Sequence, residues 1–395
     1  MSGHAAPASG RAPLHVVQLL GRGGAGAGSH VRSLSAGLVA RGLRVTICAS
    51  PAAERRWALS RVGARFVPVS GFPQPGRPGG VPSGPEAVSV LRAVCSDADL
   101  VHAHGNRAGL LGSLALGRRP VPLVVTWHAV PPVTRGGAAL GVGGMRAGVR
   151  RLTESWVARS ASVLLAATPD LVTRARRRGA SDARLAPVAL PTQRRPDPPP
   201  REGQGYKLRA EIGALDRPLL VTSVRLERGA DADALEMLLT AARGWRGLVP
   251  QPLLLIAGEG PQRAAVQRRV DREGLPVLLL GHRDEAFRQL AAADLVVFVV
   301  RWAARAPLAL EALRRGIPLV ATAVGGVPDL VGDAGVLVPF GDPAVLGRAV
   351  ADLLADPDRR AALADAGRLR AGSWPTEDTT VAQVLSVYDE LVTAP

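Results

Sequence analysis

Short apolar runs alternate with amphipathic stretches along almost the whole chain. Near the N-terminus, the apolar run Leu14 to Leu20 is followed by a glycine loop, by an amphipathic stretch from about Ser29 to Arg41, and by a second apolar run, Arg44 to Ala49. Short continuous apolar runs are typical of buried strands, and apolar positions three or four residues apart are typical of helices. This order predicts a strand, turn, helix and strand, which is the repeating unit of a parallel sheet.

The alternation continues to about residue 190 and resumes after a proline-rich, charged segment, residues 191–205, which predicts a linker. In the first part we expect further strands at Ala98 to His104, Pro122 to His128, Val163 to Ala167 and Arg184 to Ala189. In the second part we expect strands near Leu219 to Val224, Leu253 to Ala257, Val277 to Leu280, Leu295 to Val300, Ile317 to Thr322 and Gly335 to Pro339. The pattern predicts an α/β protein with two doubly wound, Rossmann-like parallel-sheet domains, residues 1–190 and 206–375.

One stretch of the second unit has the features of a ligand site. Ala306 to Arg315 reads as a crossover helix, because it opens with a proline and stops at a glycine. Its N-terminus is expected at the carboxyl edge of the sheet, where free amides favour a phosphate. Glu311 lies one turn into this helix, within reach of the sugar part of such a ligand. Gly325 and Gly326, after the next strand, have no side chains, so a bound ligand could approach their backbone. These features predict a site for a phosphorylated, sugar-bearing molecule.

The glycine loop after the first strand has a weaker pattern. Its Gly21-x-Gly23-x-x-Gly26 spacing fits the dinucleotide fingerprint. That fingerprint also needs an acidic residue after the second strand, where this chain has Ala49-Ser50-Pro51, and the loop lacks the Gly-Lys-Ser/Thr of a P-loop. Two interpretations stay open, a loop that approaches phosphate or sugar and a tight turn without a ligand.

The run Ala309 to Leu354 resembles the donor half of the retaining, two-domain nucleotide-sugar glycosyltransferases of family 4 (group 1, glycogen-synthase-like), which have the GT-B fold. That family carries two glutamates separated by seven residues; Glu311 matches the second, whereas Ala303 stands at the first. Gly23 and Gly24 resemble the Gly-Gly loop of the family's first domain. The resemblance implies an acceptor-side domain, 1–190, facing a donor domain, 206–375, across a cleft. It also implies a C-terminal helix, within 376–395, that crosses back onto the first domain.

The family's chemistry implies roles for individual residues. Arg225 and Arg228 would neutralise the leaving diphosphate in place of a metal, and His128 would face the donor sugar. Glu311 would hold the ribose, and the amides of Gly325 and Gly326 would meet the diphosphate or sugar. Gly258 and Glu259 would border the base. Retention is implied, and no cofactor is expected beyond the nucleotide-sugar co-substrate.

Two other patterns suggest metal ligands. His102-x-His104 places two imidazoles on one face of a strand, but no third ligand stands near in the sequence, so we predict no metal there. Asp97-x-Asp99 and Asp231-x-Asp233 imitate a metal motif of another glycosyltransferase fold. We expect these four carboxylates to be solvated turn residues.

The net charge of +16 comes almost wholly from arginine. No nucleic-acid recognition module accompanies it, so we predict no nucleic-acid partner. From Arg135 to Arg195 there are 12 arginines against three acidic residues, an excess of 12 − 3 = +9. The predicted helix Gly144 to Ser160 either lies on anionic membrane or packs on the sheet through its apolar side, which comprises Met145, Val149, Leu152, Trp156 and Val157.

Cys48 and Cys95 are read as buried thiols of a reducing cytoplasm, and no signal peptide is recognised, so a cytoplasmic protein is expected, with peripheral membrane contact as one alternative. Two function classes follow. One is an active glycosyltransferase that transfers sugar to a glycan or lipid acceptor of the cell envelope. The other is a weak or inactive homologue that binds a nucleotide sugar or a partner protein, suggested by Ala303.

Overall fold

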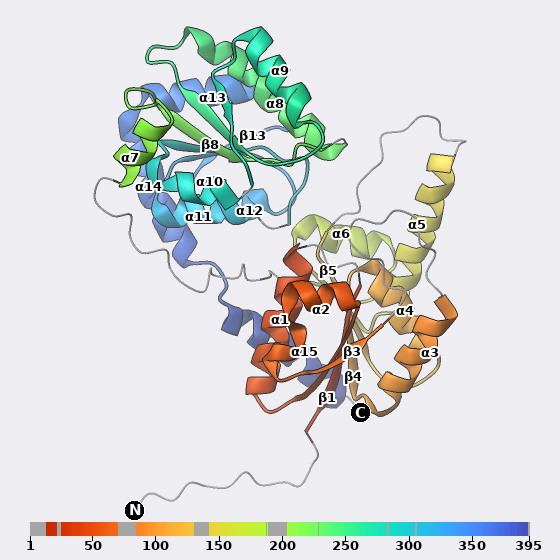
Figure 1. Cartoon of the computed structure of the whole chain (residues 1–395). Coiled ribbons are helices and arrows are strands. Elements are labelled where there is room, and N and C mark those ends of the chain that lie inside the picture. Colours follow the sequence, from red (N-terminus) through yellow and green to blue (C-terminus); the bar gives the residue numbers. More distant parts are fainter. Residues whose placement is uncertain are drawn as a thin grey trace, which may run out of the picture.

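The computed structural model contains two parallel-sheet domains, one above the other in Figure 1. It describes residues 13–21, 25–69, 84–129, 142–186, 188, 204–227, 229–282, 284–304 and 306–393. Each sheet is covered by helices on both faces, as expected when parallel strands are joined by crossover helices. The prediction of two doubly wound α/β units is confirmed.

The first sheet has seven strands in the order β3-β2-β1-β4-β5-β6-β7. Its strands are β1 His15–Leu20, β2 Arg44–Ala49, β3 Arg65–Pro68, β4 Leu100–His104, β5 Leu123–Trp127, β6 Val163–Ala166 and β7 Ala183–Leu185. Its helices are α1 Ala25–Ala40, α2 Pro51–Trp57, α3 Gly84–Val94, α4 Asn106–Leu116, α5 Val142–Ser160 and α6 Pro169–Arg177. Since β1 lies between β2 and β4, the strand order reverses there. A crevice at such a switch point is the usual ligand site of this fold class.

The second sheet has six strands in the order β10-β9-β8-β11-β12-β13. Its strands are β8 Leu219–Ser223, β9 Leu253–Ala257, β10 Val277–Leu279, β11 Leu295–Phe298, β12 Leu319–Thr322 and β13 Val336–Val338. The helices around it are α7 Gln204–Glu211, α8 Ala230–Gly244, α9 Arg263–Glu273, α10 Asp284–Gln289, α11 Pro307–Arg315, α12 Val327–Val331, α13 Pro343–Ala355 and α14 Pro357–Gly372. Here the order reverses between β8 and β11. The predicted crossover helix is α11, with Gly316 at its C-terminal end in the left-handed conformation (φ 66°).

The terminal helix α15, Glu377–Thr393, packs on the first domain, as predicted. Val381, Val384 and Tyr388 are buried with residues of α1, β1 and β2. Arg184 of β7 also holds Glu390 of α15 through two hydrogen bonds of 2.6 and 2.7 Å. Two segments of chain therefore connect the domains.

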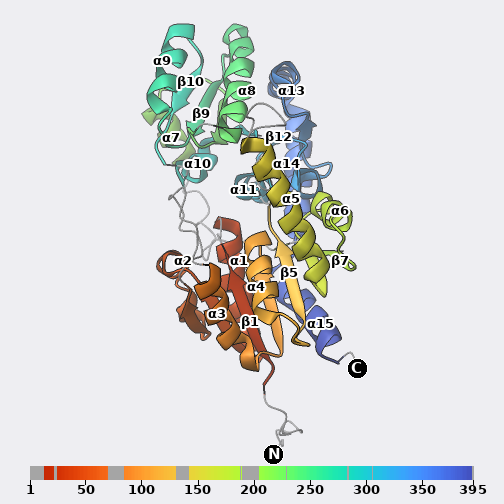
Figure 2. The same ribbon diagram turned by 90° about the vertical axis from the view of Figure 1, so that its right-hand side faces the viewer.

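The carboxyl edges of the two sheets face each other (Figure 2). Trp302, just after β11, donates from Nε1 to Asp170 Oδ2 of α6 at 2.7 Å. A Cβ added to Gly326, after β12, would lie 2.8 Å from Thr168 Cγ2, after β6. A pocket of about 210 Å³ adjoins these contacts, lined by Ala167, Leu185, Ala304, Asp329, Arg370 and Trp374 among others. Gly326, Ser373 and Pro375 also line this pocket, which therefore lies between the domains beside the segment that leads into α15.

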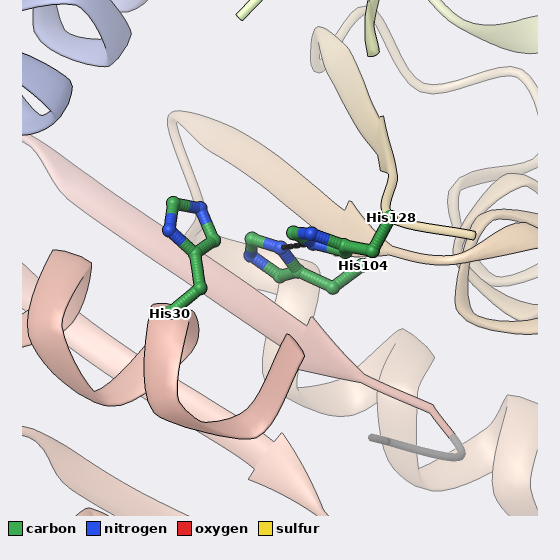
Figure 3. Close-up of side chains that lie close together, drawn as sticks. All are labelled: His30, His104 and His128. Atoms are coloured by element: carbon green, nitrogen blue, oxygen red, sulfur yellow. Dashed lines mark hydrogen bonds between the residues drawn. The ribbon is translucent and has the colours of Figure 1, made fainter. Parts of the chain in front are cut away.

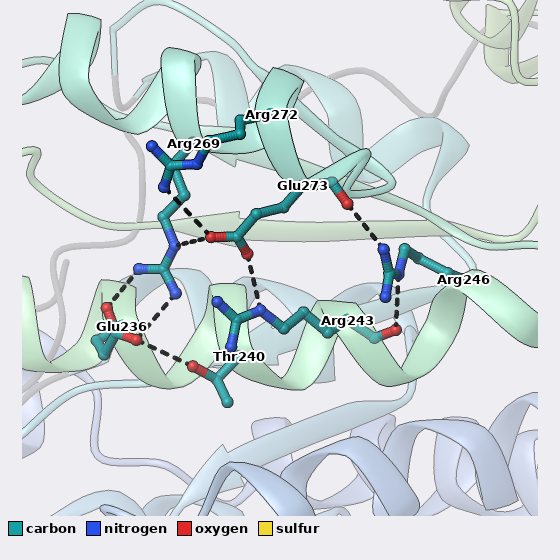
Figure 4. A network of polar contacts seen from close by, with 7 residues as sticks. All are labelled: Glu236, Thr240, Arg243, Arg246, Arg269, Arg272 and Glu273. Atoms are coloured by element: carbon teal, nitrogen blue, oxygen red, sulfur yellow. Dashed lines mark hydrogen bonds and ion pairs between the residues drawn. The ribbon is translucent and has the colours of Figure 1, made fainter.

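A network of charged side chains fixes α8 to α9 on the outside of the second domain (Figure 4). Glu273 accepts from Arg243 Nε at 2.7 Å and from Arg269 Nε at 3.0 Å. Arg269 also reaches Glu236 of α8 with Nη2, at 2.9 Å. The network holds α8 in place, and the first turn of α8 faces the switch point of the second sheet.

Candidate functional site

Arg225 follows β8, at the switch point of the second sheet. Its Nε and Nη2 both lie 2.8 Å from Asp231 Oδ2, in the first turn of α8. A guanidinium has five N–H donors, so three remain after this pairing. The paired carboxylate orients the group, and half of the side chain stays exposed, at 54%. Arg228 and its predicted role lie outside the described residues.

A second arginine at this edge was not recognised from the sequence. Arg301 follows β11, the neighbour of β8, and pairs with Asp233 of α8. The expectation that Asp231 and Asp233 are solvated turn residues is wrong. They lie in the first turn of a helix, where its positive end favours carboxylates, and each orients an arginine. In contrast, Asp97 and Asp99 are exposed where a 3-10 turn joins β4.

The glycines predicted to bind the donor are needed by the packing of the loops themselves. Gly325 has a left-handed backbone (φ 57°), and a Cβ there would lie 2.3 Å from the carbonyl oxygen of Ala303. Gly326 donates its N–H to that same oxygen at 2.8 Å. A Cβ on Gly258, after β9, would lie 1.7 Å from the Val224 carbonyl oxygen. The loops after β11 and β12 are therefore interlocked, and Ala303 lies in the joint.

Glu311 and Glu259 both lie at the same edge of the sheet. Glu311 is partly buried in α11 and accepts from Arg315 Nε at 2.7 Å. Its second oxygen, Oε2, is not used in that bond, and a carboxylate can accept several hydrogen bonds. Glu259 is exposed after β9, and its Oε1 lies 3.6 Å from Arg263 Nη1.

Three histidines meet at the switch point of the first sheet (Figure 3). His104 ends β4, His128 follows β5, and His30 belongs to α1. His104 Nδ1 lies 3.1 Å from His128 Nε2, and the His30 ring centroid is 5.5 and 5.2 Å from those of His104 and His128. Gly23 and Gly24 precede α1 but lie outside the described residues. We predicted no metal at His104 because no third ligand is near it in the sequence; in the structure His30 and His128 both lie near it.

A buried hydrogen-bond network stands behind His104. Its Nε2 lies 2.7 Å from Gln18 Oε1, which can only accept, so Nε2 carries the proton. Gln18 Nε2 in turn donates to the Tyr388 hydroxyl at 3.0 Å. Both ring nitrogens of His102 are engaged, with Tyr388 and Thr126 oxygens at 2.6 Å each. His102 thus takes a structural position, and only His104 of this pair reaches the edge.

Burial keeps these imidazoles neutral. It lowers the pKa of His102 to about 3, with a further contribution from His128. Burial also lowers the pKa of His104 well below its ordinary value, and repulsion from His102, His128 and His30 adds to this. A neutral His104 with its proton on Nε2 presents an unprotonated Nδ1 toward His128.

The helix α5 buries a different face from the one predicted. Val149, Leu152 and Trp156 are 57, 73 and 51% exposed. The buried face contains Val157 and Ala158 together with Glu154, which Arg174 holds through both carboxylate oxygens at 2.8 Å. The expectation that the whole apolar side packs on the sheet is therefore wrong, and part of it forms an exposed apolar surface. No helix in the described ranges is long and apolar enough to cross a membrane.

The two cysteines are buried as predicted. Cys48 lies in β2 and Cys95 follows α3, and both are free thiols with no exposed surface. Burial raises the pKa of Cys95 to about 11, so it is a thiol at neutral pH. It also raises the pKa of Cys48, and neither sulfur takes part in the site.

Comparison with known proteins connects this arrangement to one family. Residues 25–191 match the glycosyl transferase 4-like domain, and residues 217–356 match the glycosyl transferases group 1. The GDP-mannose-dependent alpha-(1-6)-phosphatidylinositol monomannoside mannosyltransferase of Mycolicibacterium smegmatis is 32% identical over 303 residues, which cover 66% of this chain and 77% of that protein. The D-inositol 3-phosphate glycosyltransferase of Salinispora arenicola is 32% identical over 339 residues, which cover 77% of this chain and 72% of that protein.

Solved structures agree in fold. Anabaena HepE, solved in complex with UDP, superposes with a TM-score of 0.74 at 18% identity, over 95% of this chain and all of that one. The lipopolysaccharide glycosyltransferase WaaG gives a TM-score of 0.63 at 17% identity, over 96% of this chain and 100% of that one. The family matches and the relatives found by sequence do not favour the alternative of a non-catalytic homologue. The chain belongs to the family 4, group 1 glycosyltransferases and has their GT-B fold.

Proposed function

We propose that this glycosyltransferase moves a sugar from a nucleotide-sugar donor to a glycan or lipid-linked acceptor, with retention of configuration and without a metal ion in the transfer step. One observation carries the proposal. The switch points of the two sheets lie on facing edges, with Arg225 on one and His128 on the other. A donor in the cleft would have its diphosphate at the cationic edge and its sugar toward the imidazole.

The departing diphosphate develops negative charge, and fixed positive groups lower the barrier to its departure. Arg225 has three N–H donors beyond its pairing with Asp231, enough for two phosphate oxygens. Arg228, three positions later in the sequence, would add a second charge. We assign the ribose to Glu311, the base to the Gly258–Glu259 turn, and the donor sugar to His128 and the Gly325–Gly326 loop.

We further propose that the acceptor side contacts anionic membrane through an apolar surface made of Leu114, Val149, Leu152 and Trp156. Leu114 is an exposed residue of α4. Its neighbour Ser113 accepts a hydrogen bond of 3.0 Å at Oγ from Trp156 Nε1, which links α4 to α5. The exposed Arg151 and Arg159 accompany it on α5. Arg150, Arg174 and Arg178 converge on Glu154 instead, so the local charge excess is only partly available to lipid. Two relatives are named for inositol-containing acceptors, which supports a lipid-linked or polar head-group acceptor.

The test uses the full chain and a panel of nucleotide sugars. Thermal shift should identify the donor, and nucleotide release with short glycans or inositol lipids should identify the acceptor class. Nuclear magnetic resonance should show that the sugar has the same anomeric configuration in the product as in the donor. EDTA should not lower turnover. An inverted product would refute retention, and loss of turnover with EDTA would refute the metal-independent step. Failure of every donor to stabilise the protein would refute the donor site.

A further inference from the structure

The three histidines at the first switch point have an arrangement that the transfer reaction does not require. His30, His104 and His128 each offer one ring nitrogen, and these atoms all lie within 4.8 Å of one another. We propose that they form a binding site for one divalent ion of the Zn²⁺ class, and that an ion bound there inhibits transfer by engaging His128.

The distances suit such an ion. Two nitrogens on one tetrahedral Zn²⁺ lie about 3.3 Å apart, because each Zn–N bond is about 2.0 to 2.1 Å. His104 Nδ1 and His128 Nε2 are already 3.1 Å apart. The third nitrogen, from His30, lies within 4.8 Å of the other two, so it needs a shift of up to about 1.5 Å (4.8 − 3.3 Å), which is the scale of a side-chain adjustment. Three imidazoles leave a fourth position for water or a substrate oxygen.

The surroundings of His104 favour ligation. A metal-ligating histidine usually donates its other N–H to a fixed acceptor, which sets the tautomer and orients the ring. Gln18 Oε1 is that acceptor for His104 at 2.7 Å, and Gln18 is itself held by the Tyr388 hydroxyl. The His104 lone pair on Nδ1 therefore points into the cluster.

Ligation changes one hydrogen bond. Without an ion, His128 donates its Nε2 proton to His104 Nδ1. When both nitrogens bind the ion, that proton moves to His128 Nδ1, and the ring keeps its neutral charge. Imidazole ligands suit Zn²⁺, Co²⁺, Ni²⁺ and Cu²⁺, and they are a poor match for Mg²⁺ and Ca²⁺, which prefer oxygen. Selectivity for the borderline metals therefore belongs to the proposal.

The first test is a Co²⁺ titration of the untagged full chain without donor. A four-coordinate site gives intense visible absorption, whereas six-coordinate Co²⁺ on surface groups absorbs weakly. We expect saturation at one equivalent, displacement by Zn²⁺ and no effect of excess Mg²⁺. The His30→Gln variant should bind at least tenfold more weakly. His282→Gln, which removes an exposed histidine of the second domain, is the matched control and should bind like the wild type.

The second test removes the Gln18 side chain, whose Oε1 accepts the hydrogen bond from His104 Nε2. Gln18→Ala should weaken Co²⁺ binding by about 10- to 100-fold, the usual effect of losing a group that orients a ligand. Far-ultraviolet circular dichroism checks that each variant is folded. Absence of intense absorption in the wild type, or equal binding in His30→Gln, overturns the site. These readouts do not depend on transfer, so they stand apart from the proposed function.

The inhibitory role rests on the proposed function and has its own test. Zn²⁺ should lower turnover of the wild type, and EDTA should restore it. If Co²⁺ binds as expected but Zn²⁺ leaves turnover unchanged, the ion site stands and the inhibitory role is refuted.

Discussion

Leu152 offers a sharp test of membrane contact, because it is the most exposed apolar side chain among residues 147–160 of α5. It is 73% exposed, beside Val149 and Trp156. We consider Leu152→Gln, which keeps the side-chain length and a good helix former while it removes the apolar surface. Leu369→Gln is the matched control, since Leu369 is 80% exposed on α14 of the other domain.

The magnitude follows from the exposed fraction. Burying a whole leucine side chain gives about 1.5 to 3 kcal/mol, so the 73% still exposed is worth about 1.1 to 2.2 kcal/mol on insertion into the membrane interface. This free energy corresponds to a factor of about 6 to 40 in the partition constant. Because Leu152 contributes little to the folded core, its replacement should leave the free energy of unfolding within about 0.5 kcal/mol of the wild type.

The assay is co-sedimentation of the full chain with vesicles. Neutral vesicles of phosphatidylcholine are compared with vesicles that also contain phosphatidylinositol, at low and at physiological salt. Wild-type binding should need the anionic lipid and weaken with salt, since exposed charges are screened over about 8 Å at physiological ionic strength. Leu152→Gln should partition about 6- to 40-fold less and Leu369→Gln should match the wild type.

Equal partitioning of Leu152→Gln and the wild type would refute insertion of this surface. Equal binding of the wild type to neutral and anionic vesicles would refute the electrostatic part. Loss of binding in Leu369→Gln would show that the assay reports general surface hydrophobicity, and the reasoning from α5 would fail.

Three further substitutions test the buried ion pair of α5, the charged network on α8 and α9, and the role of position 303. Glu154→Gln should destabilise the first domain by about 3 to 5 kcal/mol in a denaturant titration, because it leaves Arg174 without its carboxylate in a largely buried network; a change below about 1 kcal/mol would contradict this reading. Hydrogen bonds from Arg243 and Arg269 lower the pKa of Glu273 from 4.5 to about 2. The stability that ionised Glu273 contributes should be complete above pH 4.5 and should disappear as the pH falls toward about 2. In Glu273→Gln the thermal midpoint should therefore depend less on pH between these two values. The same pH dependence in the variant and the wild type would contradict the role of this network. Ala303→Glu should raise turnover about tenfold or more, because a carboxylate there could accept a hydrogen bond from a sugar hydroxyl; Ala303→Gln is the neutral control. A folded Ala303→Glu variant that binds the donor equally well and turns over no faster would show that the missing glutamate does not limit the enzyme.

Periodicity predicted the strands that are buried on both faces, because such strands read as continuous apolar runs. It missed the edge strand β3, whose residues are partly or fully exposed. The crossover helix α11 was also predictable, since Pro307 and Gly316 mark its ends. Periodicity failed at α5, where the buried face carries Glu154. A carboxylate can be buried there only because arginines of the next helix neutralise it, and the local pattern holds no record of that contact.

The site was harder to read because its parts are far apart in sequence. Gln18 and Tyr388 are 370 positions apart, and only the return of α15 onto β1 brings them together. His30, His104 and His128 come from α1, β4 and the segment after β5, so no spacing rule joins them. Arg301 could have been suspected as a basic residue directly after a predicted strand next to β8.

We propose that the nucleotide diphosphate leaves from the second-domain switch point, beside Arg225. The most direct measurement is donor-dependent nucleotide release by Arg225→Ala. Arg272→Ala is the control, because Arg272 is 73% exposed on α9 and lies in the outer network. We expect kcat to fall about 10²- to 10³-fold, or about 2.7 to 4 kcal/mol, in Arg225→Ala and to stay unchanged in the control. Wild-type turnover by a folded Arg225→Ala protein would contradict the assignment of the donor diphosphate to this edge.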